Sequence, residues 1–151
     1  MSYPKIAAWF LRAVGGLLVI LGLVHIAATP HIPSLLNGSP SGVYERAVGP
    51  TLLNHVLVGI LLLPLGYTTW LASGAHNSSK GWARRVLVAN TIVVFTMPVL
   101  VAVFMRRPEY YAAPLFLTGV GLLVIVSLLM VAATIFAFAK TGSPMTRSQS
   151  G

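Results

Sequence analysis

The chain has 151 residues, of which 56% are hydrophobic and 8% are charged, and its mean hydropathy is +0.85. Soluble domains carry roughly a quarter charged residues, so this composition indicates an integral membrane protein embedded in a lipid bilayer and excludes a separate soluble domain. The net charge of +8 would suggest nucleic acid as the partner of a soluble chain, but here it follows from cytoplasmic Lys and Arg, so no nucleic-acid partner is expected.

The first apolar segment predicts a membrane-spanning helix at residues 6–28. No charged residue occurs within 13–28, and with Arg12 extending toward the interface the segment attains the ~20 residues that cross a bilayer. A cleavable signal peptide is the competing interpretation, because basic residues precede the apolar run and small residues follow it. The regular glycines of the segment favour a packed helix.

Residues 29–49 are expected to form an outer loop, because this stretch holds three prolines and three glycines. Pro50 suits the first position of a helix, where its missing N–H has no intrahelical partner to lose. The second span is therefore predicted at residues 50–73, with a kink at Pro64.

Two further apolar segments predict spans at residues 82–105 and 112–139. Pro98 is expected to kink the first of these. The tail, residues 140–151, is polar and is expected to be disordered. The chain is therefore predicted to be all-α, a single integral membrane four-helix bundle.

The distribution of Lys and Arg predicts the orientation of the bundle, since cytoplasmic loops are enriched in these residues. An N-inside topology places these basic residues in the cytoplasm: Lys5, Arg12, Lys80, Arg84, Arg85, Lys140 and Arg147. It leaves Arg46, Arg106 and Arg107 outside, together with Glu45 and Glu109, the two acidic residues of the chain. Both termini are therefore expected to be cytoplasmic, and the inner membrane of a bacterium is the expected location.

Small and polar residues follow one face of each of the first two spans. Helices in a bilayer gain little from apolar contact with each other, so such faces are the ones that pack. The face of the first span carries Gly15, Gly22, His25 and Thr29, and that of the second carries Thr51, His55, Gly59, Gly66 and Thr69. With a rise of about 1.5 Å per residue, His25 and His55 both lie roughly 6 to 8 Å below the outer ends of their helices.

The two histidines are the candidate cofactor or metal ligands. A b-type haem needs two axial imidazoles on facing helices at one depth, which His25 and His55 satisfy. A divalent metal site needs three or four ligands, for which His31 and Glu45 in the outer loop are the further candidates. A quinone site is also compatible with the pair, and the absence of cysteine excludes thiolate ligands. Interhelical hydrogen bonding alone is the simpler interpretation.

A family resemblance adds to this interpretation. Residues 11–15 (LRAVG), followed by Gly22 and His25, are similar to the first helix of the DoxX-like small membrane proteins. Residues 57–66 (LVGILLLPLG) resemble the glycine-punctuated second helix of that family, and the four-span, N-inside outline matches as well. The family is linked by name to a quinol-oxidase subunit, so the resemblance implies an accessory role in the membrane more than a reaction.

Three functional hypotheses remain. The sequence has no nucleophile motif, no phosphate loop and no pair of carboxylates within a span, so catalysis is not indicated. The first hypothesis is a non-catalytic accessory or assembly component of a membrane complex, acting as a homo-oligomer or with another membrane protein. The second is a haem-, metal- or quinone-binding redox protein that uses His25 and His55. The third is a small transporter that works as an oligomer.

Overall fold

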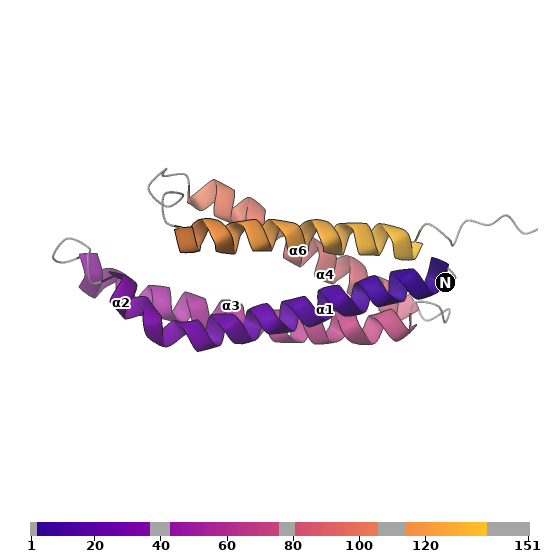
Figure 1. Cartoon of the computed structure of the whole chain (residues 1–151), viewed down its shortest axis with the longest axis horizontal. Coiled ribbons are helices and arrows are strands. Elements are labelled where there is room, and N and C mark those ends of the chain that lie inside the picture. Colours follow the sequence, from indigo (N-terminus) through magenta and orange to yellow (C-terminus); the bar gives the residue numbers. More distant parts are fainter. Residues whose placement is uncertain (1–2, 37–42, 76–80, 106–113, 139–151) are drawn as a thin grey trace, which may run out of the picture.

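The computed structural model describes residues 3–36, 43–75, 81–105 and 114–138, and every regular element within these ranges is helical. The elements are α1 (Tyr3–Ala28), the 3-10 helix η1 (Thr29–His31), α2 (Ile32–Leu36), α3 (Val43–Ala75), α4 (Gly81–Phe104) and α6 (Pro114–Phe138) (Figure 1). Four helical stretches are long and apolar enough to cross a membrane, namely Lys5–Ser34, Val48–Ala75, Gly81–Phe104 and Phe116–Phe138. The predicted all-helical fold is thus confirmed, with four helices long and apolar enough to span a membrane.

The expected outer loop is largely helical, which differs from the sequence prediction. η1 and α2 continue directly from α1, and α3 begins at Val43 and runs through Pro50 instead of starting there. Prolines are tolerated in the first turn of a helix, and η1 has Pro30 at such a position. Proline content therefore does not distinguish a loop from a succession of short helical turns in this stretch. Residues 37–42 lie outside the described part of the chain.

The remaining spans coincide closely with their predicted limits. α4 starts and ends next to the predicted 82–105, and α6 lies inside the predicted 112–139 with Pro114 as its first residue. Pro64 and Pro98 lie inside helices that continue on both sides of them. The tail at 140–151 lies outside the described residues, so its expected disorder stays a prediction.

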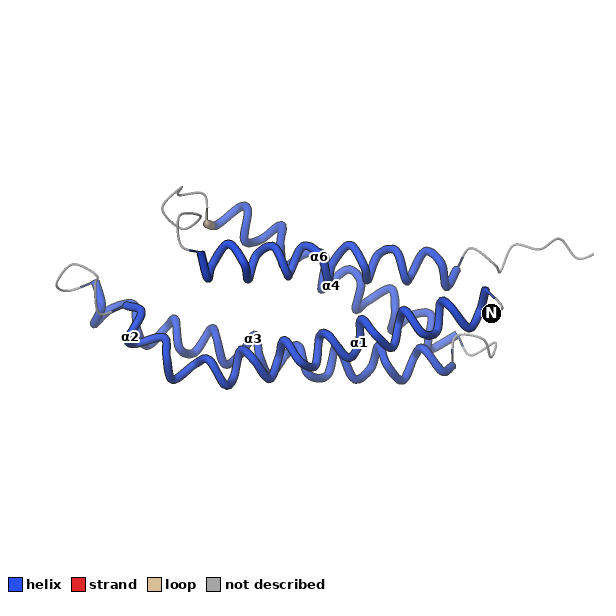
Figure 2. Tube along the Cα trace, in the orientation of Figure 1, coloured by secondary structure: helices blue, strands red, loops and turns tan. Residues whose placement is uncertain are grey.

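The four long helices form two pairs. α1 lies along α3 over most of its length, and α4 lies along α6 (Figures 1 and 2). The pairs meet through contacts of α1 with α6 and of α3 with α4. The start of α1 and the end of α6 lie at the same end of the molecule, here called the proximal end (Figure 1). A chain that crosses a membrane an even number of times has both of its ends on the same side of that membrane.

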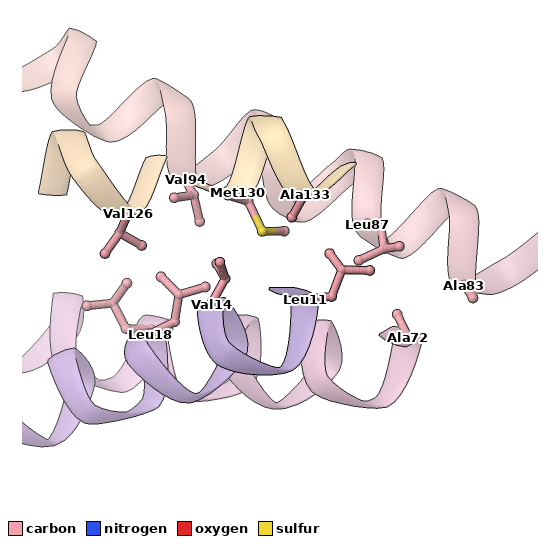
Figure 3. Close-up of a cluster of buried hydrophobic side chains, with 11 residues drawn as sticks. Leu11, Val14, Leu18, Ala72, Ala83, Leu87, Val94, Val126, Met130 and Ala133 are labelled. Atoms are coloured by element: carbon pink, nitrogen blue, oxygen red, sulfur yellow. The ribbon is translucent and has the colours of Figure 1, made fainter. Parts of the chain in front are cut away.

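Apolar side chains from all four long helices meet in one buried cluster (Figure 3). Its members are Leu11, Val14, Leu18, Leu62, Ala72, Ala83, Leu87, Val94, Val126, Met130 and Ala133. Lipid tails are as apolar as these side chains, so close van der Waals fit, more than transfer out of water, holds the cluster together.

Burial is confined to one part of the bundle. None of the described side chains in residues 23–34, 48–58, 95–105 and 116–125 is buried, and we call these ranges the distal half. The core therefore joins the two helix pairs only toward the proximal end. Beyond it, the described side chains of α4 and α6 are exposed or only partly buried.

Candidate functional site

The α1–α3 interface is built on backbone contact between glycines. A Cβ added to Gly15 would lie 2.8 Å from the carbonyl oxygen of Gly66, and Gly22 faces Gly59 in the same manner. Separations this short admit no side chain larger than hydrogen, so the helices approach more closely than any other residue would allow. The predicted contact between the two small-residue faces is present in the structure.

This close approach brings His25 and His55 together. Their ring centroids are 4.6 Å apart and their planes are inclined by 28°, so the two imidazoles stack directly. Gly59 makes the stack possible, since a Cβ at that position would lie 3.3 Å from the Cβ of His25. Both histidines are half-buried. The prediction that they lie at matched depth on facing helices is confirmed by their contact.

Hydrogen bonds orient both rings in the same way. Nδ1 of His25 lies 3.1 Å from the carbonyl oxygen of Leu21, and Nδ1 of His55 lies 2.9 Å from the carbonyl oxygen of His25. A carbonyl oxygen only accepts, so Nδ1 is the donor and carries the proton in each ring. The hydroxyl of Thr29 donates to the same His25 carbonyl at 2.8 Å. The bond from His55 links α3 to α1 and is part of the packing of the two helices.

The geometry leaves Nε2 of each ring with a lone pair. A neutral imidazole that is protonated on Nδ1 is unprotonated on Nε2. Among the described residues, no hydrogen bond reaches either Nε2, and no buried side-chain nitrogen or oxygen lacks a partner. Both Nε2 atoms therefore reach accessible surface. An imidazole held through Nδ1–H by a backbone carbonyl is the arrangement that metal-ligating histidines commonly have.

The direct contact of the two imidazole rings has different consequences for binding a haem and for binding a metal ion. A bis-histidyl haem holds its two imidazoles on opposite faces of the porphyrin. The rings of His25 and His55 are in direct contact, so they would have to separate by the width of a macrocycle to accept a haem. A single ion shared by the two Nε2 atoms requires a change in the angle between the rings, but no separation by the width of a macrocycle.

The structure does not bring all predicted ligands to the pair. His31 is exposed in η1, where its carbonyl oxygen accepts a bond from Ser34 at 2.7 Å. Within the part of the chain that the structure describes, no group of three or more His, Asp or Glu side chains is placed to hold a metal ion. The side chain of Glu45 lies outside that part, as do Arg106, Arg107 and Glu109.

Asn90 is a polar centre that ties α4 to α3. Its side-chain nitrogen lies 3.1 Å from the carbonyl oxygen of Leu65, and it donates to the hydroxyls of Thr68 and Thr69 at 2.9 Å each. An amide N–H inside a bilayer has no water to bond, so these acceptors offset the cost of burying it. Asn90 therefore joins α4 to α3 through its side chain.

A second polar link, which the sequence analysis missed, joins α4 to α6. The hydroxyls of Thr91 and Thr134 lie 2.8 Å apart, and Ser127 donates to the carbonyl oxygen of Val94 at 3.1 Å. The available signal was the seven-residue spacing of Ser127 and Thr134, which places both on one face of a helix. These links hold the second helix pair together on the side that faces the core.

Comparison with known proteins assigns the chain to no family. No protein-family model matches the chain, and neither a curated protein nor a solved structure matches it. The chemistry of the site therefore rests on the membrane-spanning helices, their polar contacts and the histidine pair.

The proximal end carries basic and aromatic side chains. The guanidinium of Arg12 donates to the hydroxyl of Ser73 at 3.3 Å, and that of Arg84 lies 4.5 Å above the ring centre of Phe138. Both cations are exposed, as expected for side chains at a membrane surface. An apolar hollow of about 180 Å³ lies beside them between α1 and α6, lined by Ile6, Ala7, Phe10 and Phe136. Its lining carries no polar group that would orient a ligand.

Proposed function

We propose that the chain is a non-catalytic membrane protein, an accessory or assembly component that works by packing against another membrane protein or a second copy of itself. The observation that carries the proposal is the distal half of α6. Gly119 and Gly121 lie there with nothing within 4 Å of an added Cβ. No described side chain of residues 116–125 is buried.

Glycine within a helix has a cost that packing normally offsets. It is about 1 kcal/mol less favourable than alanine in a helix interior. In α1 and α3 the glycines compensate by allowing the close backbone contact at Gly22 and Gly59. Gly119 and Gly121 make no such close contact with the described residues. Small residues on a lipid-facing helix are the type that admits a partner helix to close range.

Two further features support an accessory role. The first two spans resemble the DoxX-like small membrane proteins, and that resemblance implies the same kind of role. The distal surface of α4 is apolar as well, with exposed Val99, Leu100 and Phe104, so a partner helix would meet apolar side chains on both members of the pair. We place the protein in a bacterial inner membrane with both termini in the cytoplasm, as the charge distribution predicts.

The proposal is tested by adding bulk at the distal surface of α6. Gly119 and Gly121 are two residues apart and lie on different sides of α6. We expect the substitution on the side of the partner, Gly119→Leu or Gly121→Leu, to convert the native assembly, purified in nanodiscs, into a smaller species on size-exclusion chromatography with light scattering. Val124→Leu is the matched control, because Val124 is 38% exposed on the same helix and already carries a branched side chain. The control should keep the mass of the wild-type assembly.

Two outcomes would refute this function. One is a wild-type protein that has the mass of a single chain at every concentration and carries no co-purifying membrane protein. The other is an assembly of unchanged mass and stoichiometry in both glycine variants.

A further inference from the structure

The histidine pair has two nitrogen atoms that helix packing does not use. We propose that Nε2 of His25 and Nε2 of His55 together bind one divalent transition-metal ion. This site is separate from the distal surface of α6 and does not depend on a partner bound there. The stacked rings, the shared hydrogen-bonding pattern and the accessible Nε2 atoms carry the proposal.

The hydrogen bonds hold the Nδ1 atoms of both rings against α1. The two acceptor carbonyls belong to Leu21 and His25, which are four residues apart and so lie one turn apart on the same face of α1. Each ring therefore turns its Nδ1 edge toward α1. Nε2 is not adjacent to Nδ1 in the imidazole ring, so these carbonyl contacts leave both Nε2 atoms free.

The spacing of the rings suits one shared ion. Imidazole nitrogen binds zinc at about 2.0–2.1 Å, so two nitrogens on the same ion are at most about 4 Å apart. The ring centroids are 4.6 Å apart and the planes are inclined by 28°. Because the lone pair of each Nε2 lies in its ring plane, the rings must open from this stack for both nitrogens to reach one ion. The Nδ1–H bonds to backbone carbonyls fix the tautomer and make each Nε2 a better ligand.

The ligand type defines the class of ion. Imidazole suits Zn²⁺, Cu²⁺ and Ni²⁺, whereas Mg²⁺ and Ca²⁺ prefer oxygen ligands. Two imidazoles leave coordination positions that water molecules fill. Ligation also offsets the cost of an imidazole nitrogen that has no hydrogen-bond partner inside a membrane span.

The test uses Zn²⁺ and Cu²⁺ with the full chain purified in nanodiscs. We expect calorimetric titration to give one Zn²⁺ per chain. The paramagnetic resonance spectrum of bound Cu²⁺ should show coupling to two nitrogens. His31→Ala is the matched control, because His31 is an exposed histidine outside the stack; it should retain wild-type affinity and stoichiometry.

One variant separates metal binding from folding. The amide nitrogen of asparagine occupies nearly the position of histidine Nδ1, so His55→Asn can retain the bond to the His25 carbonyl while removing Nε2. We expect this variant to fold with wild-type helicity and thermal stability and to bind Zn²⁺ at least about 10-fold more weakly. The coupling in the Cu²⁺ spectrum should fall from two nitrogens to one.

Three results would overturn the metal site. They are the absence of stoichiometric Zn²⁺ binding by folded wild-type protein, unchanged affinity in folded His55→Asn, and loss of binding in His31→Ala. None of these results changes the mass of the assembly, so failure of the metal site is distinguishable from failure of the proposed accessory function.

Discussion

Gly22 of α1 and Gly59 of α3 are in reciprocal backbone contact. A Cβ added to Gly22 would lie 2.8 Å from the carbonyl oxygen of Gly59, and one added to Gly59 would lie 2.9 Å from the carbonyl oxygen of Gly22. Gly15 and Gly66 repeat the arrangement two turns further along the helix pair. These contacts set the distance between the helices and, through it, the stacking of the two histidines.

Alanine at Gly22 or Gly59 should weaken the α1–α3 interface. The obstructing atoms include a backbone oxygen of the facing glycine at each position, which can move only if the helices separate. We expect each substitution to lower the free energy of unfolding by about 1–3 kcal/mol, the usual range for overpacking a well-packed core. Unfolding in mixed micelles with increasing dodecyl sulfate measures the effect. Gly49→Ala is the control, since nothing lies within 4 Å of a Cβ there, and it should be neutral or slightly stabilising. Equal stability of Gly59→Ala and Gly49→Ala would contradict the contact.

Removal of the Asn90 amide should destabilise the contact of α4 with α3. Asn90→Ala leaves the hydroxyls of Thr68 and Thr69 without their donor, and we expect a loss of about 1–2 kcal/mol in the free energy of unfolding. Thr96→Val is a suitable control, because the hydroxyl of Thr96 is exposed and bonds only Ile92 of its own helix, at 2.7 Å. A larger effect for the threonine than for the asparagine would show that Asn90 does not join the helices.

The hydroxyl pair between α4 and α6 should appear as a coupling energy. In a double-mutant cycle of Thr91→Val and Thr134→Val, we expect about 0.6 kcal/mol, the average for interhelical hydrogen bonds in a membrane protein. The parallel cycle of Thr96→Val with Thr134→Val should give a value near zero, since the hydroxyl of Thr96 bonds its own helix. Coupling energies of equal size in the two cycles would argue against a direct bond.

The orientation in the membrane can be measured with single cysteines, because the chain has none of its own. We expect Ser34→Cys to react with a membrane-impermeant maleimide in intact cells. Ser79→Cys and Ser150→Cys should react only after the membrane is opened, since both positions are predicted to be cytoplasmic. Labelling of Ser150→Cys in intact cells would reverse the assigned topology.

The spans and the α1–α3 face were predictable from sequence for a simple physical reason. A long apolar run is sufficient to identify a transmembrane helix, and small residues recurring every three or four positions identify the face that packs. Gly15, Gly22, Gly59 and Gly66 supply that pattern, and His25 and His55 lie within it. Two antiparallel faces with this pattern bring the histidines to one level.

Other features depend on information that local sequence does not carry. α6 has apolar residues on every side, so hydrophobic periodicity does not show which face meets α4. Ser127 and Thr134 mark one face of α6, but their partners on α4 are known only once the two helices are placed. The imidazoles stack because two backbone carbonyls of α1 accept hydrogen bonds from their Nδ1–H groups. This arrangement depends on side-chain rotamers, which the local sequence does not specify. The helical turns at Thr29–Leu36 were missed because proline content was interpreted as a loop signal.

The buried polar side chains of the described helices already have hydrogen-bond partners within the chain, which limits how another protein can recognise them. In the described part of the chain, buried side-chain nitrogens and oxygens all have partners, and the hydroxyls of Thr68 and Thr96 donate to carbonyls of their own helices. Apart from the imidazoles and the exposed amide of Asn54, the large exposed side chains of these helices are mostly apolar. Another membrane protein would therefore recognise these helices mainly by their shape. Substitutions that change side-chain volume should affect its binding more than substitutions that change polarity.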